Sequence, residues 1–145
     1  MSLFSLMSVS GSGLSAQRVR AQLLVENMAN AETTRTPEGG PYRRKDAVFA
    51  SQPQASPFSA LFQAEIGGGM TGVSVADVIE DTGEPVKRYM PGHPDAAPDG
   101  YVAFPRVNPA EDMVDLMNAT RNYQANVSAI AAVRDMIHRT LDLLR

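Results

Sequence analysis

The chain has 145 residues, a formal net charge of −3 and no cysteine. The length suits one ordinary domain or a small domain with long extensions. The charge gives no basic field to attract nucleic acid or an anionic membrane, and the lack of thiols excludes disulfides, thiolate metal sites and a cysteine nucleophile. The first residues lack the charged start and continuous apolar run of a secretory signal, so we expect any export to use a signal-less route.

The prolines and glycines divide the chain into three parts. All ten prolines lie from Pro37 to Pro109, and nine of the eleven glycines lie from Gly39 to Gly100. These residues interrupt helices. The sequence therefore predicts an α+β chain with a helical segment over 1–36, an extended segment and small β domain over 37–108, and a second helical segment over 109–145.

The first segment has the spacing of an amphipathic helix. Leu14, Ala21 and Met28 recur at intervals of seven, and Val25 fills an intermediate turn. The two glycines before Leu14 leave the start of the helix less certain. We expect this helix to pair with the helix predicted at the other end of the chain.

The middle segment predicts several short strands. The β-branched residues from Val73 to Ile79 precede a turn signal, and residues 86–90 and 101–104 are two further candidates. Residues 58–65 are expected to form a short strand or a turn of helix. Strands this few and short make a β domain too thin to be stable by itself.

The last segment carries strong helix signals. Asn108 and Pro109 form a typical helix start, with acidic residues in the first turns. Apolar residues then recur with a period of 3.5, which predicts a left-handed coiled coil. Nothing else in the chain could cover so long a stripe. We therefore expect this helix to form an antiparallel coiled coil with the first helix and to bind further partners. The alternative is an amphipathic helix that lies on a globular body. The ten positions of this heptad stripe are Met113, Leu116, Thr120, Tyr123, Val127, Ile130, Arg134, Ile137, Leu141 and Leu144.

Side chains that could carry chemistry are few. His93, Asp95 and Asp99 are close in sequence, but the chain has two histidines and no cysteine, and their spacing matches no metal motif. His138 stands among aspartates on one helix face, which is typical of a solvated ion-pair surface. No nucleophile, base and orienting group are placed together. The sequence predicts no enzyme, no cofactor and no metal site.

Several motifs, in order along the chain, resemble those of the bacterial flagellar axial proteins, which are the rod, hook and hook-associated subunits. The insertion over 36–49 is most similar to that of proximal-rod members. The other motifs that carry the resemblance are Asn27-Met-Ala-Asn30-Ala-Glu-Thr-Thr, Pro41-Tyr-Arg-Arg-Lys45, Tyr89-Met-Pro-Gly-His-Pro-Asp95, Gly100-Tyr-Val102, Glu111-Asp-Met-Val-Asp-Leu116 and Arg121-Asn-Tyr-Gln-Ala-Asn126.

The resemblance implies a structural subunit of the proximal rod, a tube that crosses the periplasm, transmits torque and encloses the export channel. It implies terminal helices that line the tube, and export without a cleaved signal peptide. The implied partners are copies of the chain, other rod proteins, the motor-base ring or export gate at the proximal end and the distal rod at the other, with no nucleic acid and no small-molecule substrate. The alternatives are a coiled-coil adaptor, another axial subunit of the distal rod or hook, and a small enzyme or metal-binding protein that uses His93.

A set of residues is expected to form the assembly interface. Asn27 and Asn30 stand at the expected end of the first helix, where asparagine tolerates the left-handed conformation. Tyr42, Arg43 and Arg44 follow on an extended segment, as subunit contacts or, alternatively, as a solvated charged strand. The other expected interface residues are Leu14, Ala21, Val25, Met28, Met113, Leu116, Tyr123, Val127, Ile130, Ile137, Leu141 and Leu144.

Overall fold

The computed structural model describes residues 3–53 and 71–143. Two long helices and two small antiparallel sheets give an α+β fold, as predicted. The prediction for residues 58–65 lies outside the described residues, and so does Leu144. The elements are α1 (Leu3–Ala29), β1 (Lys45–Pro53), β2 (Thr71–Glu80), β3 (Val86–Tyr89), β4 (Tyr101–Phe104) and α3 (Pro109–Asp142).

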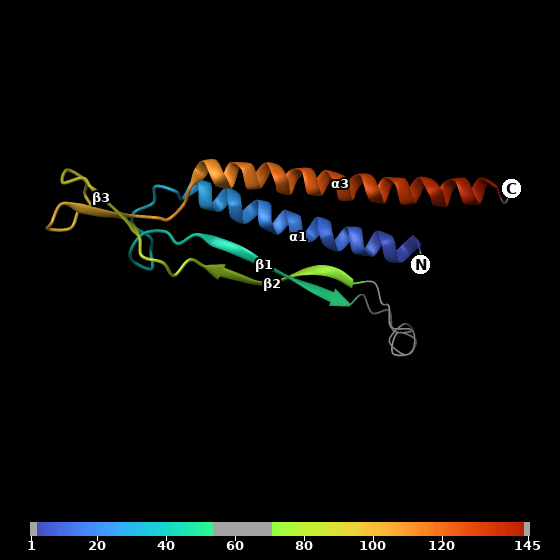
Figure 1. Cartoon of the computed structure of the whole chain (residues 1–145), viewed down its shortest axis with the longest axis horizontal. Helices are drawn as coiled ribbons and strands as arrows, with labels where there is room; N and C mark the ends of the chain where they lie inside the picture. Colours follow the sequence, from blue (N-terminus) through green and yellow to red (C-terminus); the bar gives the residue numbers. More distant parts are fainter. Residues whose placement is uncertain (1–2, 54–70, 144–145) are drawn as a thin grey trace.

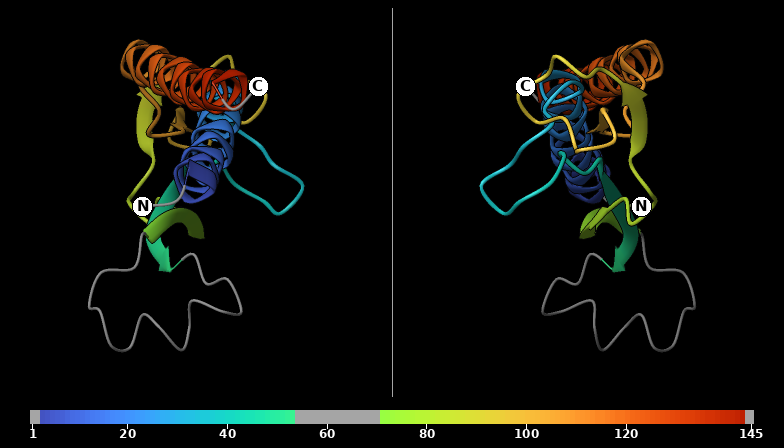
Figure 2. Two further views of the ribbon diagram at one scale, coloured as in Figure 1. Left: turned by 90° about the vertical axis from the view of Figure 1, so that its right-hand side faces the viewer. Right: turned by 90° about the vertical axis from the view of Figure 1, so that its left-hand side faces the viewer.

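The molecule is elongated, and α1 forms its middle layer. Helix α3 runs antiparallel along one side of α1, so that both termini lie at the same end of the molecule (Figure 1). The ribbon of β1 and β2 lies along another side of α1, as the end-on views also show (Figure 2). The hairpin of β3 and β4 lies at the end opposite the termini (Figure 1). The pairing of the two helices leaves much of both helix surfaces open.

Helix α1 continues through the two glycines that made its start uncertain. Gly13 lies where α1 crosses α3, and a Cβ added there would meet the side chain of Asn126 at 3.2 Å. The missing side chain therefore lets the two helices approach closely. Ala16, one turn further on, is buried in the same contact region.

Helix α3 starts as the sequence predicts. Asn108 is the N-cap, and its side-chain oxygen accepts a hydrogen bond of 3.2 Å from the backbone N–H of Ala110. Pro109 occupies the first turn, where its missing N–H costs nothing. Glu111 and Asp112 add negative charge at the positive end of the helix dipole.

The face of α3 that contacts α1 differs from the predicted stripe in alternate turns. Leu116, Ile130 and Ile137 are half-buried, as the stripe requires. The intervening contacts are one residue earlier than predicted, whereas Met113 and Leu141 are 58% and 57% exposed. Met113 and Leu141 are therefore not packed within the chain, and the coiled-coil pairing along the whole stripe stays a prediction. The intervening positions are Asp112, Ala119, Asn126 and Val133, again seven residues apart.

The strands form two separate pairs among the described residues. β1 pairs with β2 from Lys45 opposite Glu80 to Pro53 opposite Thr71, with a bulge after Val48. The three strands predicted near 73–79, 86–90 and 101–104 are confirmed by β2, β3 and β4. The sequence did not predict β1 over its full length, because the bulge breaks the alternation of its side chains.

Candidate functional site

Asn27 joins the end of α1 to the start of β1. It is fully buried, and its Nδ2 donates a hydrogen bond of 2.9 Å to the backbone oxygen of Lys45. Its Oδ1 accepts from the backbone N–H of Lys45 and from the hydroxyl of Tyr42, both at 2.9 Å. The side-chain amide thus pairs with the strand backbone as another strand would. These hydrogen bonds satisfy buried polar groups that would cost free energy if they were left without partners.

The expected left-handed conformation at Asn27 and Asn30 is wrong, because no described non-glycine residue has a positive φ. α1 continues to Ala29, and the Asn30 amide Nδ2 donates back to the carbonyl of Glu26 at 2.9 Å. Asn30 Oδ1 also accepts from the hydroxyl of Thr33 at 3.2 Å. These side-chain hydrogen bonds end the helix without strained backbone.

Tyr42 is buried against this junction. Lys45 Nζ lies 5.8 Å from the centre of its ring and 2.7 Å from a carboxylate oxygen of Glu26. Burial raises the pKa of Tyr42 to about 12, and the negative charge of Glu26 acts in the same direction. The phenol is therefore held neutral, which is the form that donates to Asn27.

This pKa predicts that the junction loses stability in alkali. The unfolded chain releases the Tyr42 proton near pH 10 and the folded chain near 12, so the folded state binds more protons between these values. We expect the unfolding free energy of the isolated chain to fall by about 1.4 kcal/mol more in wild type than in Tyr42→Phe between pH 9 and pH 11. Urea titrations at the two pH values measure this difference; an equal loss in both proteins would contradict it.

An ion pair with a buried carboxylate ties the same junction to α3. Arg44 Nη2 lies 2.8 Å from an oxygen of Asp112, whose side chain is 1% exposed, and 3.5 Å from Asp46. Burial raises the pKa of Asp112, and the Arg44 guanidinium opposes that rise. Asp112 lies in the first turn of α3. The pair therefore fixes the start of α3 against the start of β1.

Arg43 lies outside the buried part of the junction. Its side chain is exposed, and Nη1 donates to the backbone oxygen of Asp81 at 3.3 Å. The structure thus brings Asn27, Tyr42 and Arg44 together inside the chain, and leaves Arg43 at the surface.

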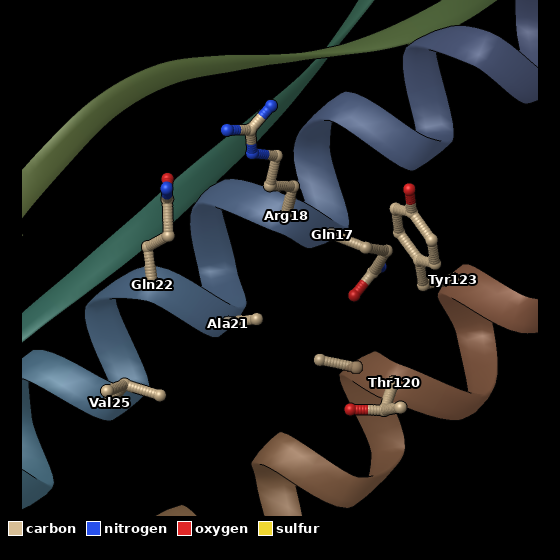
Figure 3. A pocket seen from close by; sticks show the side chains of 8 residues that line it. Gln17, Arg18, Ala21, Gln22, Val25, Thr120 and Tyr123 are labelled. Atoms are coloured by element: carbon tan, nitrogen blue, oxygen red, sulfur yellow. The ribbon is translucent and has the colours of Figure 1, made fainter.

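An open groove of about 590 Å³ runs between α1 and α3. Ala21 and Val25 face Thr120 across it, and Tyr123 lies beside Gln17 at one end (Figure 3). Ala119 also lines it. The other lining residues are Arg18 and Gln22.

The exposed apolar side chains of the predicted stripe extend this groove along α3. Met113 and Val127 flank Thr120 at intervals of seven residues, which places the three on one side of the helix. Val25, Met113, Tyr123 and Val127 are all substantially exposed. We call this set, with Ala21 and Thr120, the outer flank. Leu14 and Met28 on α1 are half-buried. An apolar surface of this kind is typical of an interaction site.

The histidine and aspartates of the β3–β4 loop are engaged in hydrogen bonds within the chain. His93 Nδ1 accepts from the backbone N–H of Asp95 at 3.1 Å, and Asp95 accepts from the hydroxyl of Thr34 at 2.8 Å. Asp99 accepts from the backbone N–H of Tyr101 at 3.2 Å. Across residues 3–53 and 71–143, no three histidine or acidic side chains are grouped so that they could hold a metal ion.

Comparison with known proteins identifies the family. Residues 99–143 match the family described as flagellar basal body rod FlgEFG protein C-terminal. The flagellar basal-body rod protein FlgC of Borreliella burgdorferi is 38% identical over 100% of this chain and 99% of its own length. The chain belongs to the FlgC family of flagellar basal-body rod proteins. FlgC of Bacillus subtilis is 38% identical over 99% of each chain, and FlgC of Escherichia coli O6:H1 is 40% identical over 99% of this chain and 98% of its own.

Membership of the FlgC family makes the chain a structural subunit of the flagellar basal-body rod, which assembles with other rod components. The matched C-terminal segment contains β4 and all of α3. No helix within the described part of the chain is long and apolar enough to cross a membrane.

Proposed function

We propose that the chain polymerises in the proximal rod, where α1 and α3 of neighbouring subunits form a coiled coil that lines the tube. The observation that carries the proposal is the outer flank, an apolar surface with heptad spacing on two helices that are already paired. A heptad period keeps the apolar side chains facing a partner helix along its whole length. The flank therefore suits a partner helix from a neighbouring subunit.

The end of α3 supports the same proposal. α3 extends beyond the start of α1 (Figure 1), and Leu141 in this extension is exposed. The chain itself offers no helix alongside these last turns among the described residues. Because an unpacked helix end is marginal in water, neighbouring subunits would stabilise it.

In this role the protein acts mechanically. The subunit transmits torque along the rod and encloses the export channel across the periplasm, and it performs no catalysis and needs no cofactor. Its partners are copies of itself, other rod proteins, the motor-base ring or export gate at the proximal end, and the distal rod at the other. Delivery takes place without a cleaved signal peptide. Asn27, Tyr42 and Arg44 serve the interface indirectly, by setting how the two helices are presented.

Cysteine cross-linking tests the interface. The chain has no cysteine, so a single introduced thiol reports on one position only. We expect Val127→Cys on the outer flank to cross-link neighbouring subunits in purified basal bodies treated with a short bis-maleimide. Arg121→Cys, also exposed but pointing away from the flank, is the matched control on the same helix. Equal cross-linking at both positions, or none at Val127→Cys in assembled rods, would contradict the proposed interface.

A structural role predicts that the histidines are dispensable. We expect the double variant His93→Ala, His138→Ala to keep rod assembly and swimming in a complemented deletion strain, because neither residue carries out chemistry. His93 loses a hydrogen bond to the backbone of Asp95 and an edge-on ring contact with Phe104, and His138 is exposed. Swimming halos and the amount of chain in purified rods measure the outcome. Loss of motility with normal export and stability would support a functional metal or catalytic site instead.

A further inference from the structure

The hairpin of β3 and β4 has one buried face and one exposed face. Val102 and Phe104 fill the buried face, at 1% and 7% exposure. Cross-strand partners point to the same face of a sheet, and successive residues along a strand point to opposite faces. We call the exposed side the hairpin face, and its two cross-strand pairs are Lys87 with Ala103 and Tyr89 with Tyr101.

The two tyrosines of the hairpin face are held in position although they are exposed. Their ring centres lie 5.3 Å apart in an edge-to-face arrangement. Gly100 has a φ of +79°, and a Cβ added there would lie 2.7 Å from the ring of Tyr89, so the ring packs against the glycine backbone. Tyr89 and Tyr101 are nevertheless 65% and 44% exposed. Aromatic side chains that are already ordered lose little freedom on binding and are typical anchors of protein interfaces.

The ribbon of β1 and β2 has an exposed face of a different character. Lys45 on the opposite face binds Glu26 of α1 at 2.7 Å, so that side of the ribbon lies towards the helix. The side that points away from α1 combines two aliphatic side chains with two carboxylates, all exposed. We call it the ribbon face, and its two cross-strand pairs are Asp46 with Ile79 and Val48 with Asp77.

The hairpin face and the ribbon face match in size and in charge. Each presents two cross-strand pairs that are two residues apart, which is about 7 Å along a strand. Lys87 has no carboxylate within 4.0 Å among the described residues, and Asp77 has no cation within that distance. The two faces do not meet within one chain, because the hairpin and the ribbon make no contact with each other in the part that the structure describes.

We propose that the hairpin face of one subunit packs on the ribbon face of a second copy of the chain, with Lys87 beside Asp77. The proposal rests on the proposed polymerisation and adds a contact separate from the outer flank. Because the two faces differ, the contact is head-to-tail, and each copy uses one face on each of two neighbours. Contacts of this kind build rings or open helical arrays, as the wall of a tube requires. The opposite charges fix the register of the two faces.

Exchange of the two charges tests the contact. We expect Lys87→Glu to lower the amount of chain in purified rods at least about 10-fold, because it sets like charges against each other, and Asp77→Lys to act in the same way. The double variant should restore the wild-type amount. Since the hairpin and the ribbon do not touch within one chain, such a rescue comes from contact between chains. Wild-type assembly of both single variants, or a double variant no better than either, would overturn the proposal.

Cysteine cross-linking in purified basal bodies tests the same contact without changing its charges or tyrosines. A chain with Ala103→Cys and Val48→Cys should form a ladder of cross-linked dimers and larger species with a short bis-maleimide. The matched control replaces Val48→Cys by Val78→Cys, because Val78 is 40% exposed against 39% but lies on the opposite face of the ribbon. Neither Ala103→Cys nor Val48→Cys alone should form dimers. Equal ladders from the two double variants, dimers from a single variant, or no ladder from assembled rods would overturn the proposal.

The cross-linking of Val127→Cys separates this proposal from the proposed function. Rods that cross-link through the outer flank, but give no ladder from Ala103→Cys with Val48→Cys, would contradict the head-to-tail contact alone. Rods in which Val127→Cys fails to cross-link, but which give the ladder, would contradict the proposed role of the outer flank alone.

Discussion

We expect Ile130→Asp to abolish incorporation of the chain into the rod while synthesis and export continue. Ile130 is half-buried on the side of α3 that faces α1, midway along the heptad stripe. A carboxylate there must be desolvated, at a cost of several kcal/mol, or take up a proton. Every copy in the tube carries the same defect, so the penalty is repeated around the wall. Swimming of a complemented deletion strain and the protein content of purified rods measure the effect.

Asp135→Ala is the matched control for this variant. Asp135 lies five residues further along the same helix, is exposed, and makes no ion pair within 4.0 Å of another described residue. Removing an exposed charge of this kind changes stability little. We expect Asp135→Ala to swim as the wild type does. Equal swimming by the two variants would show that this face of α3 does not support assembly.

The second large effect is expected from Arg44→Ala. The substitution leaves Asp112 buried without its cation, and breaking a buried pair in this way typically costs about 3–5 kcal/mol. We expect the urea midpoint of the isolated chain to fall accordingly. Circular dichroism during a urea titration measures the loss. A change below about 1 kcal/mol would show that the pair does not hold the junction.

The loss in Arg44→Ala should depend on pH. Burial already raises the pKa of Asp112, and removing Arg44 raises it further. Between the unfolded value of 3.8 and that raised value the folded state binds more protons, so stability falls as pH rises and is regained as pH falls. The deficit should thus be larger at pH 7 than at pH 4.5. A deficit that stayed constant or grew on acidification would contradict this explanation.

Arg20→Ala provides the control for the loss of an ion pair. Arg20 also joins the two helices, through a contact of 3.3 Å with Asp115, but the two side chains are 36% and 33% exposed. A pair with this much solvent access contributes roughly 0–1 kcal/mol. We expect Arg20→Ala to change the urea midpoint far less than Arg44→Ala. Comparing the stability losses of Arg20→Ala and Arg44→Ala separates the effect of burying an ion pair from the effect of removing a positive charge.

Local signals made much of the fold predictable. Asn108 and Pro109 mark the start of α3 by chemistry that involves only adjacent residues. The heptad period of the C-terminal segment correctly predicted one long helix. The turns after Glu80 and Tyr89 likewise bounded the short strands.

The sequence alone did not predict the junction of α1, β1 and α3, because the residues that contact each other there are far apart along the chain. Arg44 and Asp112 are separated by 68 residues, and Asp112 alone resembles an ordinary acidic residue in a first helical turn. Asn27 was assigned to a helix end because its pairing with Lys45, across 18 residues, has no local signature. Gly13 lies against the side chain of Asn126 on the other helix, a contact that no local pattern in the sequence predicts.

The central claim is that α1 and α3 build the wall of the proximal rod, and a density map of basal bodies that contain this chain tests it most directly. Comparison with basal bodies from a strain that lacks the chain would locate its density. The proposal predicts that this density lies in the proximal rod, with α1 and α3 around the channel and the outer flank of each copy against a neighbouring helix. Density for the chain outside the rod wall, or an outer flank that faces solvent in the assembled rod, would contradict it.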